Sequence, residues 1–361
     1  MSKNDDLMQG FAKRNIKTVM DALQAGAEVN SYDAKGRTAL MWATHLGQTE
    51  IVKILIETGA DVNTSDNRSR TALMIASEEG LAAIASILIE NSADVDAKDN
   101  TGWSALMYAV QEGHSEIVRL LVGAGADVNV RYASDETVLM TATEEGFTEI
   151  ARTLIKAGAD INAIENDNGW NALMFAIQKG YREIARLLIE AGANVNIKRK
   201  YDYFTALMIA SDNGNIQIVK KLIEAGADVN VIARNGRTAL MGASFSGNTE
   251  IIKLLIETGA EINAKDNDGR TALMEASENG HTEIVKLLIK FDADVNSSNN
   301  DGRTALMWAS ANGQTEIVRQ LIEAGGDVRT RDNYSDTALM WSLEYEHSEI
   351  VKLLRQAGAR E

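Results

Sequence analysis

The chain of 361 residues contains no cysteine and no proline, only 5% aromatic residues, and a net charge of −16. The lack of cysteine excludes disulfides and thiolate metal sites, and it fits a reducing compartment. The negative charge argues against direct binding of nucleic acid or of an anionic membrane, because both are bound through basic surface.

Residues 1–8 lack the basic start and the apolar core of a signal peptide. No apolar run along the chain reaches the roughly 18–20 residues that span a bilayer, so we expect a soluble cytoplasmic protein. Residues 6–30 have the pattern of a helix pair, with Thr18 and Asp21 where the later units have apolar residues. Polar residues at such positions are typical of a pair that caps a repeat array.

From residue 33 onward, one unit recurs with a period of about 33 residues. The tetrapeptide Thr-Ala-Leu-Met at 38–41 returns nine times, with small changes, at spacings of 33 or 34 residues. The later copies begin at Thr71, Ser104, Thr137, Asn171, Thr205, Thr238, Thr271, Thr304 and Thr337. A period in this range indicates stacked structural repeats, each too small to bury its apolar face alone.

Within one unit, residues 33–65, the order of local signals predicts two helices. A turn-forming segment is followed by Thr38, which can cap a first helix, and Gly47 ends that helix. A second helix begins at Thr49, with apolar residues on one side and a charged, solvated side opposite. Gly59 follows it as a left-handed C-cap. Each unit is therefore predicted to be a turn, a helix, a loop and a second helix.

This unit, which ends in Gly-Ala-Asp-Val-Asn, resembles the ankyrin repeat over almost the whole chain. The resemblance implies an all-α solenoid of about eleven stacked helix pairs with connecting β-turn or hairpin loops. We expect one domain, residues 1–361, with an N-terminal cap helix pair at 1–32, nine internal repeats at 33–331 and a C-terminal capping repeat at 332–361. In the last repeat, Arg355 stands where internal repeats have Ile or Val.

The repeat departs from the family pattern in one motif. The family's Thr-Pro-Leu-His is Thr-Ala-Leu-Met here, so its helix-starting proline and its histidine hydrogen-bond network are absent. We expect the recurring methionines to fill that space by packing against neighbouring repeats.

Positions that vary between repeats are free to bind a partner. The residues four, seven and eight after the Thr, Ser or Asn of the motif share one side of the first helix, and we call this side the first-helix face. The resemblance implies that it lines a concave groove beside the turn tips. Its thirty positions hold nine acidic residues and one lysine. Trp42, Trp308 and Trp341 lie on this face, and Trp103 and Trp170 stand at the residue before the Thr, Ser or Asn of the motif, beside the turn tip.

Two turns carry one extra residue each, namely those that precede Asn171 and Thr205. The second of them, residues 198–204, is a basic and aromatic segment on an acidic protein. It is interpreted either as a contact point, for an acidic partner or for the chain's own groove, or as a surface loop that tolerates insertion.

Aromatic residues are common at interface hot spots, and acidic residues beside them suit a cationic segment. An alternative is that half-buried positions take large residues and that the glutamates only keep the surface soluble. The predicted partner-binding residues are Trp42, Glu78, Glu79, Trp103, Tyr108, Glu112, Glu144, Glu145, Trp170, Phe175, Tyr201, Tyr203, Trp308 and Trp341.

Catalytic and metal-binding chemistry is not indicated. The four histidines are spread along the array, and no zinc-site spacing or phosphate-binding loop is present. Paired carboxylates such as Glu78 and Glu79 are expected on an open surface, where their pKa values would stay ordinary. We therefore predict no catalytic residue, no metal, no cofactor and no enzymatic activity.

The favoured function is a monomeric protein–protein interaction scaffold that binds a basic or amphipathic segment of another protein along an acidic, aromatic groove. One alternative is an acidic inhibitor or decoy of a nucleic-acid-binding enzyme. Another is a small-molecule sensor that uses an aromatic pocket near Trp103, Tyr108 and Trp170. A consensus-derived scaffold is a further interpretation, against which the irregular turns argue.

Overall fold

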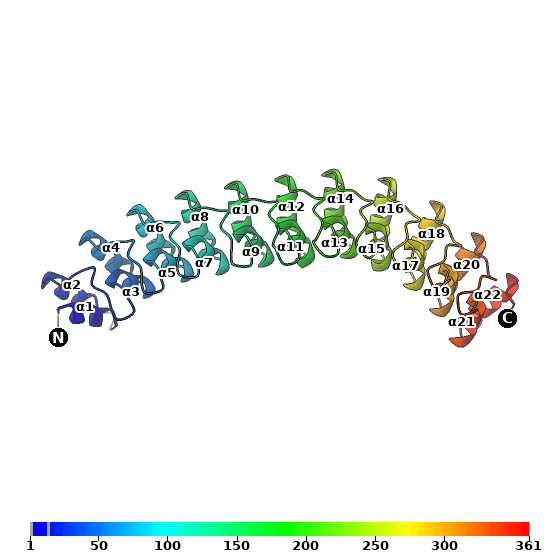
Figure 1. The fold of residues 1–361 in the computed structure, drawn as a ribbon, viewed down its shortest axis with the longest axis horizontal. Helices are drawn as coiled ribbons and strands as arrows, with labels where there is room; N and C mark the ends of the chain where they lie inside the picture. The colour runs from blue at the N-terminus through cyan, green and yellow to red at the C-terminus, as the bar shows by residue number, and fades with distance from the viewer. Residues whose placement is uncertain (1–2, 13–14, 361) are drawn as a thin grey trace. The chain divides into compact units, whose positions relative to one another are not determined.

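The computed structural model describes residues 3–12 and 15–360. These residues form 22 α helices and no strand. The helices follow one another in pairs, as the repeat predicts. The chain divides into two compact units, one up to Asp167 and one from Asn168, and each is described by itself. Within each unit, successive helix pairs stack in chain order (Figure 1).

The first unit contains five helix pairs. Its helices are α1 (Lys3–Ala12), α2 (Ile16–Gln24), α3 (Ala39–His45), α4 (Thr49–Glu57), α5 (Ala72–Glu78), α6 (Ala82–Glu90), α7 (Ala105–Gln111), α8 (Ser115–Gly123), α9 (Val138–Glu144) and α10 (Thr148–Lys156). Residues 1, 2, 13, 14 and 361, which fall within the predicted cap segments 1–32 and 332–361, lie outside the described residues.

The second unit contains six helix pairs. Its helices are α11 (Ala172–Lys179), α12 (Arg182–Glu190), α13 (Ala206–Asp212), α14 (Ile216–Glu224), α15 (Ala239–Ser246), α16 (Thr249–Glu257), α17 (Ala272–Glu278), α18 (Thr282–Lys290), α19 (Ala305–Ala311), α20 (Thr315–Glu323), α21 (Ala338–Glu344) and α22 (Ser348–Gln356). The expected all-α repeat architecture is thus confirmed. Among the helices of the described residues, none combines the length and apolar character needed to cross a membrane.

Each first helix from α3 onward begins with a side-chain cap at the residue that the repeat predicts. Oγ1 of Thr71 accepts a hydrogen bond from the backbone N–H of Met74 at 3.3 Å. In the second unit, Oδ1 of Asn171 accepts one from Met174 at 2.9 Å. The cap satisfies one of the N–H groups that a helix N-terminus leaves free. Four of the preceding turns also close as antiparallel bridges, such as Ser65 with Thr71, which is the expected hairpin form.

The core of each unit lies between neighbouring helix pairs. In the fourth pair, Leu106 and Met107 on α7 and Val118 and Leu121 on α8 are each at most 1% exposed. The apolar sides of the two helices therefore face the same interior, and the adjoining pairs cover it. The expected packing role of the methionines is confirmed by their burial, since those from Met41 to Met307 are at most 3% exposed.

Polar bonds also fix how one pair stands on the next. Oδ1 of Asn63 accepts a hydrogen bond from the backbone N–H of Asp94 at 2.7 Å, and its Nδ2 donates to the carbonyl of Ser92 at 3.0 Å. In the second unit, Asn230 bonds the N–H of Glu261 and the carbonyl of Gly259 in the same way. The Asn that ends the repeat motif therefore satisfies backbone groups of the following repeat.

Three histidines make a further bond between repeats, which the sequence analysis did not anticipate. Nε2 of His114 lies 3.1 Å from the carbonyl oxygen of Glu78, one repeat earlier. His281 and His347 contact the equivalent carbonyls at 3.0 Å. Because a carbonyl oxygen only accepts, Nε2 carries the proton in each ring. The histidine thus bonds a carbonyl near the end of the preceding first helix, where helices leave carbonyls free.

Two methionines at equivalent positions can test whether the core lies between neighbouring repeats. Met307 is 2% exposed, whereas Met340, at the same position of the last pair, is half-buried. Met307→Ala is expected to lower the free energy of unfolding by about 2–5 kcal/mol. Met340→Ala should cost clearly less, because fewer neighbours enclose the cavity it leaves. Urea unfolding followed by circular dichroism measures both, and equal losses would contradict a core made between repeats.

Candidate functional site

The residue just before the capping Thr, Ser or Asn of each first helix from α3 onward lies beside the first-helix face, and we call it the turn position. Five of the ten turn positions are arginine, and their guanidinium groups reach aromatic rings on the face. The turn positions are Arg37, Arg70, Trp103, Glu136, Trp170, Phe204, Arg237, Arg270, Arg303 and Asp336.

Arg70 shows what an arginine at the turn position does in the first unit. Its Nη2 forms an ion pair with Glu78 on α5. Its guanidinium carbon lies 5.3 Å from the ring centre of Tyr108 on α7, one repeat later. The arginine therefore neutralises one glutamate and makes a cation–π contact with one aromatic ring.

The predicted residues near Trp42 are paired in a similar way. Arg37 lies 3.8 Å over the Trp42 ring, and the indole N–H donates to Asp33 at 3.2 Å. Glu79 contacts Nδ1 of His45 at 3.3 Å. A cavity of about 540 Å³ is lined by Trp42, Glu78 and Glu79 together with both turn arginines. The structure thus brings the predicted residues Trp42, Glu78 and Glu79 together around one cavity, but Arg37 and Arg70 line the same cavity.

The next part of the first unit has no arginine at the turn position. Trp103 occupies that place in the fourth pair, and its ring centre lies 5.0 Å from Tyr108 and 5.1 Å from Tyr132. The rings of Trp103 and Tyr132 meet at 74°, so they form two walls of a corner. A cavity of about 400 Å³ is lined by both rings and also by Glu144 and Glu145.

Glu136, the turn position of the fifth pair, also lines this cavity. Burial raises its pKa, and the negative charges of Glu144, Glu165 and Asp167 raise it further, against a hydrogen bond from Ser134. We call the cavity with Trp103, Tyr132, Glu136, Glu144 and Glu145 the acidic aromatic pocket. Its members Tyr132 and Glu136 were not predicted from the sequence. Glu112, which was predicted, lies exposed at the C-cap of α7.

Hydrogen bonds fix the aromatic side of the pocket. The hydroxyl of Tyr108 donates to Oδ2 of Asp99 at 2.7 Å, and Oδ1 of Asp99 accepts from the backbone N–H of Trp103 at 2.9 Å. The hydroxyl of Tyr132 donates to the carbonyl of Met107 at 3.2 Å. Burial, together with the Asp99 carboxylate, raises the pKa of Tyr108 to about 12. Both tyrosines are therefore neutral and fixed in orientation at physiological pH.

When the turn positions are counted together with the first-helix face, the net negative charge falls mainly on one part of the face. In the second and third pairs, the first-helix face and turn positions hold two arginines and two glutamates. In the fourth and fifth pairs they hold four glutamates and no basic residue. In the second unit they hold five acidic and four basic residues. The acidic character predicted for the whole face is thus concentrated around the acidic aromatic pocket, because arginines offset it elsewhere.

In the second unit, Trp170 stacks on Phe175 with ring centres 5.1 Å apart, and Arg199 lies 4.5 Å over Trp170. The sequence analysis grouped Trp170 with Trp103 and Tyr108 in one aromatic pocket. Trp103 and Tyr108 belong to the first unit, and this grouping stays a prediction. Tyr201 and Tyr203 are exposed at the tip of the basic turn. The turn itself is held at its base by a hydrogen bond from the N–H of Lys200 to the carbonyl of Asn168 at 3.0 Å.

Trp308 and Trp341 lie together near the end of the second unit. Arg303 lies between them, 5.4 Å and 4.5 Å from their ring centres, and its Nε is 3.4 Å from Asp332. With Tyr345 the two tryptophans line a cavity of about 380 Å³. Among the described residues, neither indole N–H has a hydrogen-bond partner. An arginine of the chain itself thus already stacks on both predicted residues.

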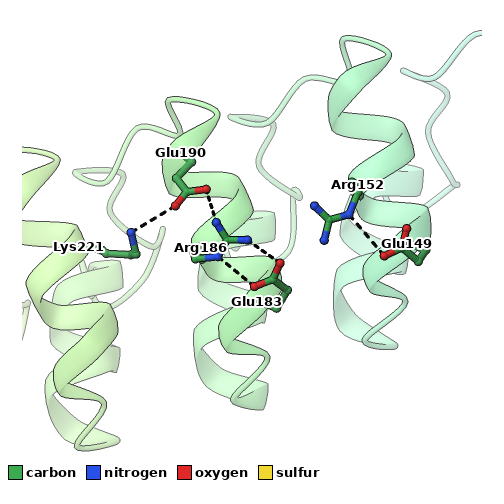
Figure 2. Close-up of polar contacts among 6 residues, drawn as sticks. All are labelled: Glu149, Arg152, Glu183, Arg186, Glu190 and Lys221. Atoms are coloured by element: carbon green, nitrogen blue, oxygen red, sulfur yellow. Dashed lines mark hydrogen bonds and ion pairs between the residues drawn. The ribbon is translucent and has the colours of Figure 1, made fainter.

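The exposed sides of the second helices are different in character (Figure 2). Arg186 on α12 bonds Glu183 at 2.6 Å and Glu190 at 2.5 Å, and Lys221 on α14 reaches Glu190 at 3.3 Å. In the first unit, Arg152 makes an exposed pair of the same kind on α10. Exposed pairs contribute little stability, but they leave these sides nearly neutral. The predicted solvated, charged side of the second helix is confirmed.

Comparison with known proteins agrees with the repeat. A family model described as ankyrin repeats, in three copies, matches residues 7–99, 67–132, 106–199, 207–299 and 273–360. A search of the curated proteins finds no match. Within the described residues, no group of three or more His, Cys, Asp or Glu side chains is placed to hold a metal ion.

Tyr108→Phe tests the hydrogen bond that fixes the aromatic wall. Burial raises the pKa of Asp99, but hydrogen bonds from Thr101, Tyr108 and Trp103 outweigh it and hold that pKa below its ordinary value. Such a carboxylate stabilises the fold above its unfolded pKa, and this contribution is lost as the pH falls through the folded pKa. We expect Tyr108→Phe to lose about 1 kcal/mol at pH 7, and the loss to shrink below about pH 4.

Urea unfolding at several pH values measures this difference. Tyr132→Phe is the matched control, because its hydroxyl bonds a carbonyl and not a carboxylate. Its loss of stability should stay constant over the same pH range. A Tyr108→Phe effect as independent of pH as that of the control would refute the role given to Asp99.

Proposed function

The chain belongs to the ankyrin-repeat family, whose repeats generally mediate protein–protein interaction, and we propose that it binds a basic or amphipathic segment of another protein. The acidic aromatic pocket and the first-helix face around it form the binding site. The observation that carries the proposal is the local charge, namely four glutamates and no basic residue on the face and turn positions of the fourth and fifth pairs.

Charge complementarity is the reason for a basic segment. Surface charges act over a Debye length of about 8 Å at physiological salt, so a neutralised neighbouring repeat contributes little field at the pocket. The glutamates of the pocket therefore act together on a cation that approaches this part of the face. Such a field raises the association rate and selects partners by sign of charge.

The aromatic wall is the reason for an amphipathic segment. Trp103 and Tyr132 are both half-buried, so part of each ring remains available for apolar contact. A cavity of about 400 Å³ has the volume of one or two large side chains, and the rest of a bound segment would lie along the adjoining first helices. An anchor side chain in a pocket beside a polar surface is the usual arrangement of an interface hot spot.

The other functions have less support. A decoy of a nucleic-acid-binding enzyme needs negative charge over a long face, and in the second unit the first-helix face and turn positions together are close to neutral. A sensor of small molecules would use the same aromatic wall, but the carboxylates restrict its ligands to cations. The family is typically a non-enzymatic scaffold. Monomeric state and cytoplasmic location stay predictions from the sequence.

A labelled peptide tests the proposal. Two glycine- and leucine-spaced dodecapeptides, one with six lysines and one with six glutamates, are titrated with the full chain by fluorescence anisotropy. We expect the lysine peptide alone to bind, at least tenfold more weakly in 0.5 M than in 0.05 M salt. Glu144→Lys with Glu145→Lys should weaken it at least tenfold.

The matched control reverses two exposed glutamates in the first turns of second helices, Glu116→Lys with Glu149→Lys. This control changes the net charge of the chain by the same amount, so it should lower the affinity no more than twofold. Equal weakening by both double variants, or binding that ignores salt, would argue for a diffuse charge effect and against this site.

A further inference from the structure

Two neighbouring turns of the second unit carry positive charge on a chain whose net charge is −16. Residues 198–204 and 231–237 together contain five basic residues and one acidic residue. The two turns adjoin, because the backbone N–H of Arg234 donates to the carbonyl of Asp202 at 2.8 Å. Nη1 of Arg234 also donates to the carbonyl of Tyr201 at 3.3 Å. The two turns therefore form one continuous surface.

The exposed side chains of these turns combine cations with large apolar groups. Among the described residues, neither Lys198 nor Arg234 forms an ion pair. Tyr201, Tyr203 and Ile232 are 54%, 45% and 56% exposed. We call the set the basic turn surface, and its members are Lys198, Lys200, Tyr201, Tyr203, Ile232 and Arg234.

The place of Lys200 and Arg234 is taken by asparagine in the later turns of the second unit. At each of these places the backbone N–H donates to the preceding turn, so the places are equivalent. Nδ2 of Asn267 donates to the carbonyl of Arg234 at 2.9 Å, and Asn300 and Asn333 make the same bond one turn further on. The basic turn surface thus has long cationic side chains where the repeat elsewhere has a short amide that ties two turns together.

Tyr203 has a backbone conformation that large side chains rarely adopt. Its φ is 61°, in the left-handed region, which costs free energy for a residue with a bulky side chain. The equivalent residues of the other nine turns are glycine, serine or aspartate. Strain of this kind concentrates at functional sites. The exposed ring of Tyr203 therefore has a cost in folding that a contact with a partner would explain.

We propose that the basic turn surface docks an acidic segment of a partner protein, and that this segment carries aromatic residues. Its carboxylates pair with the three cations, and its rings pack on the two tyrosines and on Ile232. The inference goes beyond the proposed function, because it concerns a different part of the chain and a partner segment of the opposite charge.

Charge and extent together indicate an acidic protein segment. Surface charges act over a Debye length of about 8 Å at physiological salt, so this surface attracts anions locally although the whole chain is negative. A nucleic acid strand carries a phosphate at every nucleotide and would extend past these two turns, where the next turn exposes Asp268. A protein segment can place a few carboxylates beside the cations and none elsewhere.

The cations of this turn already contact aromatic rings within the chain. Nζ of Lys200 lies 5.4 Å from the ring centre of Tyr201, and the guanidinium of Arg199 lies 4.5 Å over Trp170. Arg199 also pairs with a carboxylate of its own turn, whereas Arg234 is exposed. A ring of the partner would gain a cation–π contact with Arg234 and edge or face contacts with the exposed tyrosines. Carboxylates without rings would gain only the charge attraction.

A labelled peptide tests the inference. A hexadecapeptide with six glutamates and three tryptophans is titrated with the full chain by fluorescence anisotropy. We expect it to bind, at least tenfold more weakly in 0.5 M than in 0.05 M salt. The same peptide with serine in place of tryptophan should bind at least tenfold more weakly than the tryptophan peptide, because it keeps the charge and loses the rings.

Lys200→Asn with Arg234→Asn gives both turns the residue of the later turns. This double variant should lower the affinity for the tryptophan peptide at least tenfold, while the urea midpoint stays equal or rises. The matched control, Lys253→Gln with Lys286→Gln, removes two exposed cations from the second helices α16 and α18. It should change the affinity no more than twofold.

Tyr203→Gly separates binding from folding. Glycine adopts the left-handed conformation without strain, so the urea midpoint should stay equal or rise. The affinity for the tryptophan peptide should fall at least threefold, because one ring of the surface is lost. A residue with a structural role alone would lose stability when replaced, and its loss would not weaken the peptide in a chain that folds equally well.

Four results would overturn the inference. They are equal weakening by the two double variants, a serine peptide that binds as tightly as the tryptophan peptide, a single-stranded oligonucleotide that binds more tightly than either, and self-association of the chain that Lys200→Asn with Arg234→Asn abolishes. The proposed function is tested separately. Glu144→Lys with Glu145→Lys should not weaken the tryptophan peptide, and failure of the lysine peptide to bind would leave the basic turn surface standing.

Discussion

Burial between neighbouring repeats is the constraint on which the rest of the structure depends. A single helix pair has an apolar side that only the next pair can cover, so residues such as Met107 are enclosed by their neighbours. Asparagines at the ends of the repeats and histidines at the starts of second helices then bond backbone groups one repeat away. Within each unit, these contacts fix one pair on the next, so that equivalent surface residues of successive pairs lie at a regular spacing.

The sequence predicted most of the fold because its signals are local or periodic. A capping threonine acts on an N–H three residues later, so Thr71 could be identified from its own motif. Ten copies of the motif start ten of the eleven helix pairs, and the pattern of residues 6–30 predicted the first pair. The histidine bonds escaped notice because they join residues 36 positions apart, such as His114 and Glu78, and no local signal marks them.

The candidate site was predicted only in part, for a similar reason. Glu144 and Glu145 were found by following equivalent positions through the helices, and Trp103 was found as a tryptophan just before the motif; the structure places all three around one cavity. Tyr132 and Glu136 were missed because only the helix positions were compared through all the repeats, and the turn residues were not. The charge count made from the sequence left out the turn positions, from which Arg70 reaches Glu78, eight residues later, and Tyr108, in the next repeat. The recurrence of arginine before five of the motifs was the available signal.

The arginines of the face have a consequence for how a long, repetitive partner would sit. A basic segment with many similar side chains could in principle slide along a uniformly acidic surface, because every position would be equivalent. In the first unit, Arg37 and Arg70 already occupy the rings and carboxylates of the second and third pairs. A sliding segment would have to displace them. If a basic segment binds as proposed, one pocket beside repeats whose rings and carboxylates are already occupied would fix the alignment of that segment along the face as well as its affinity.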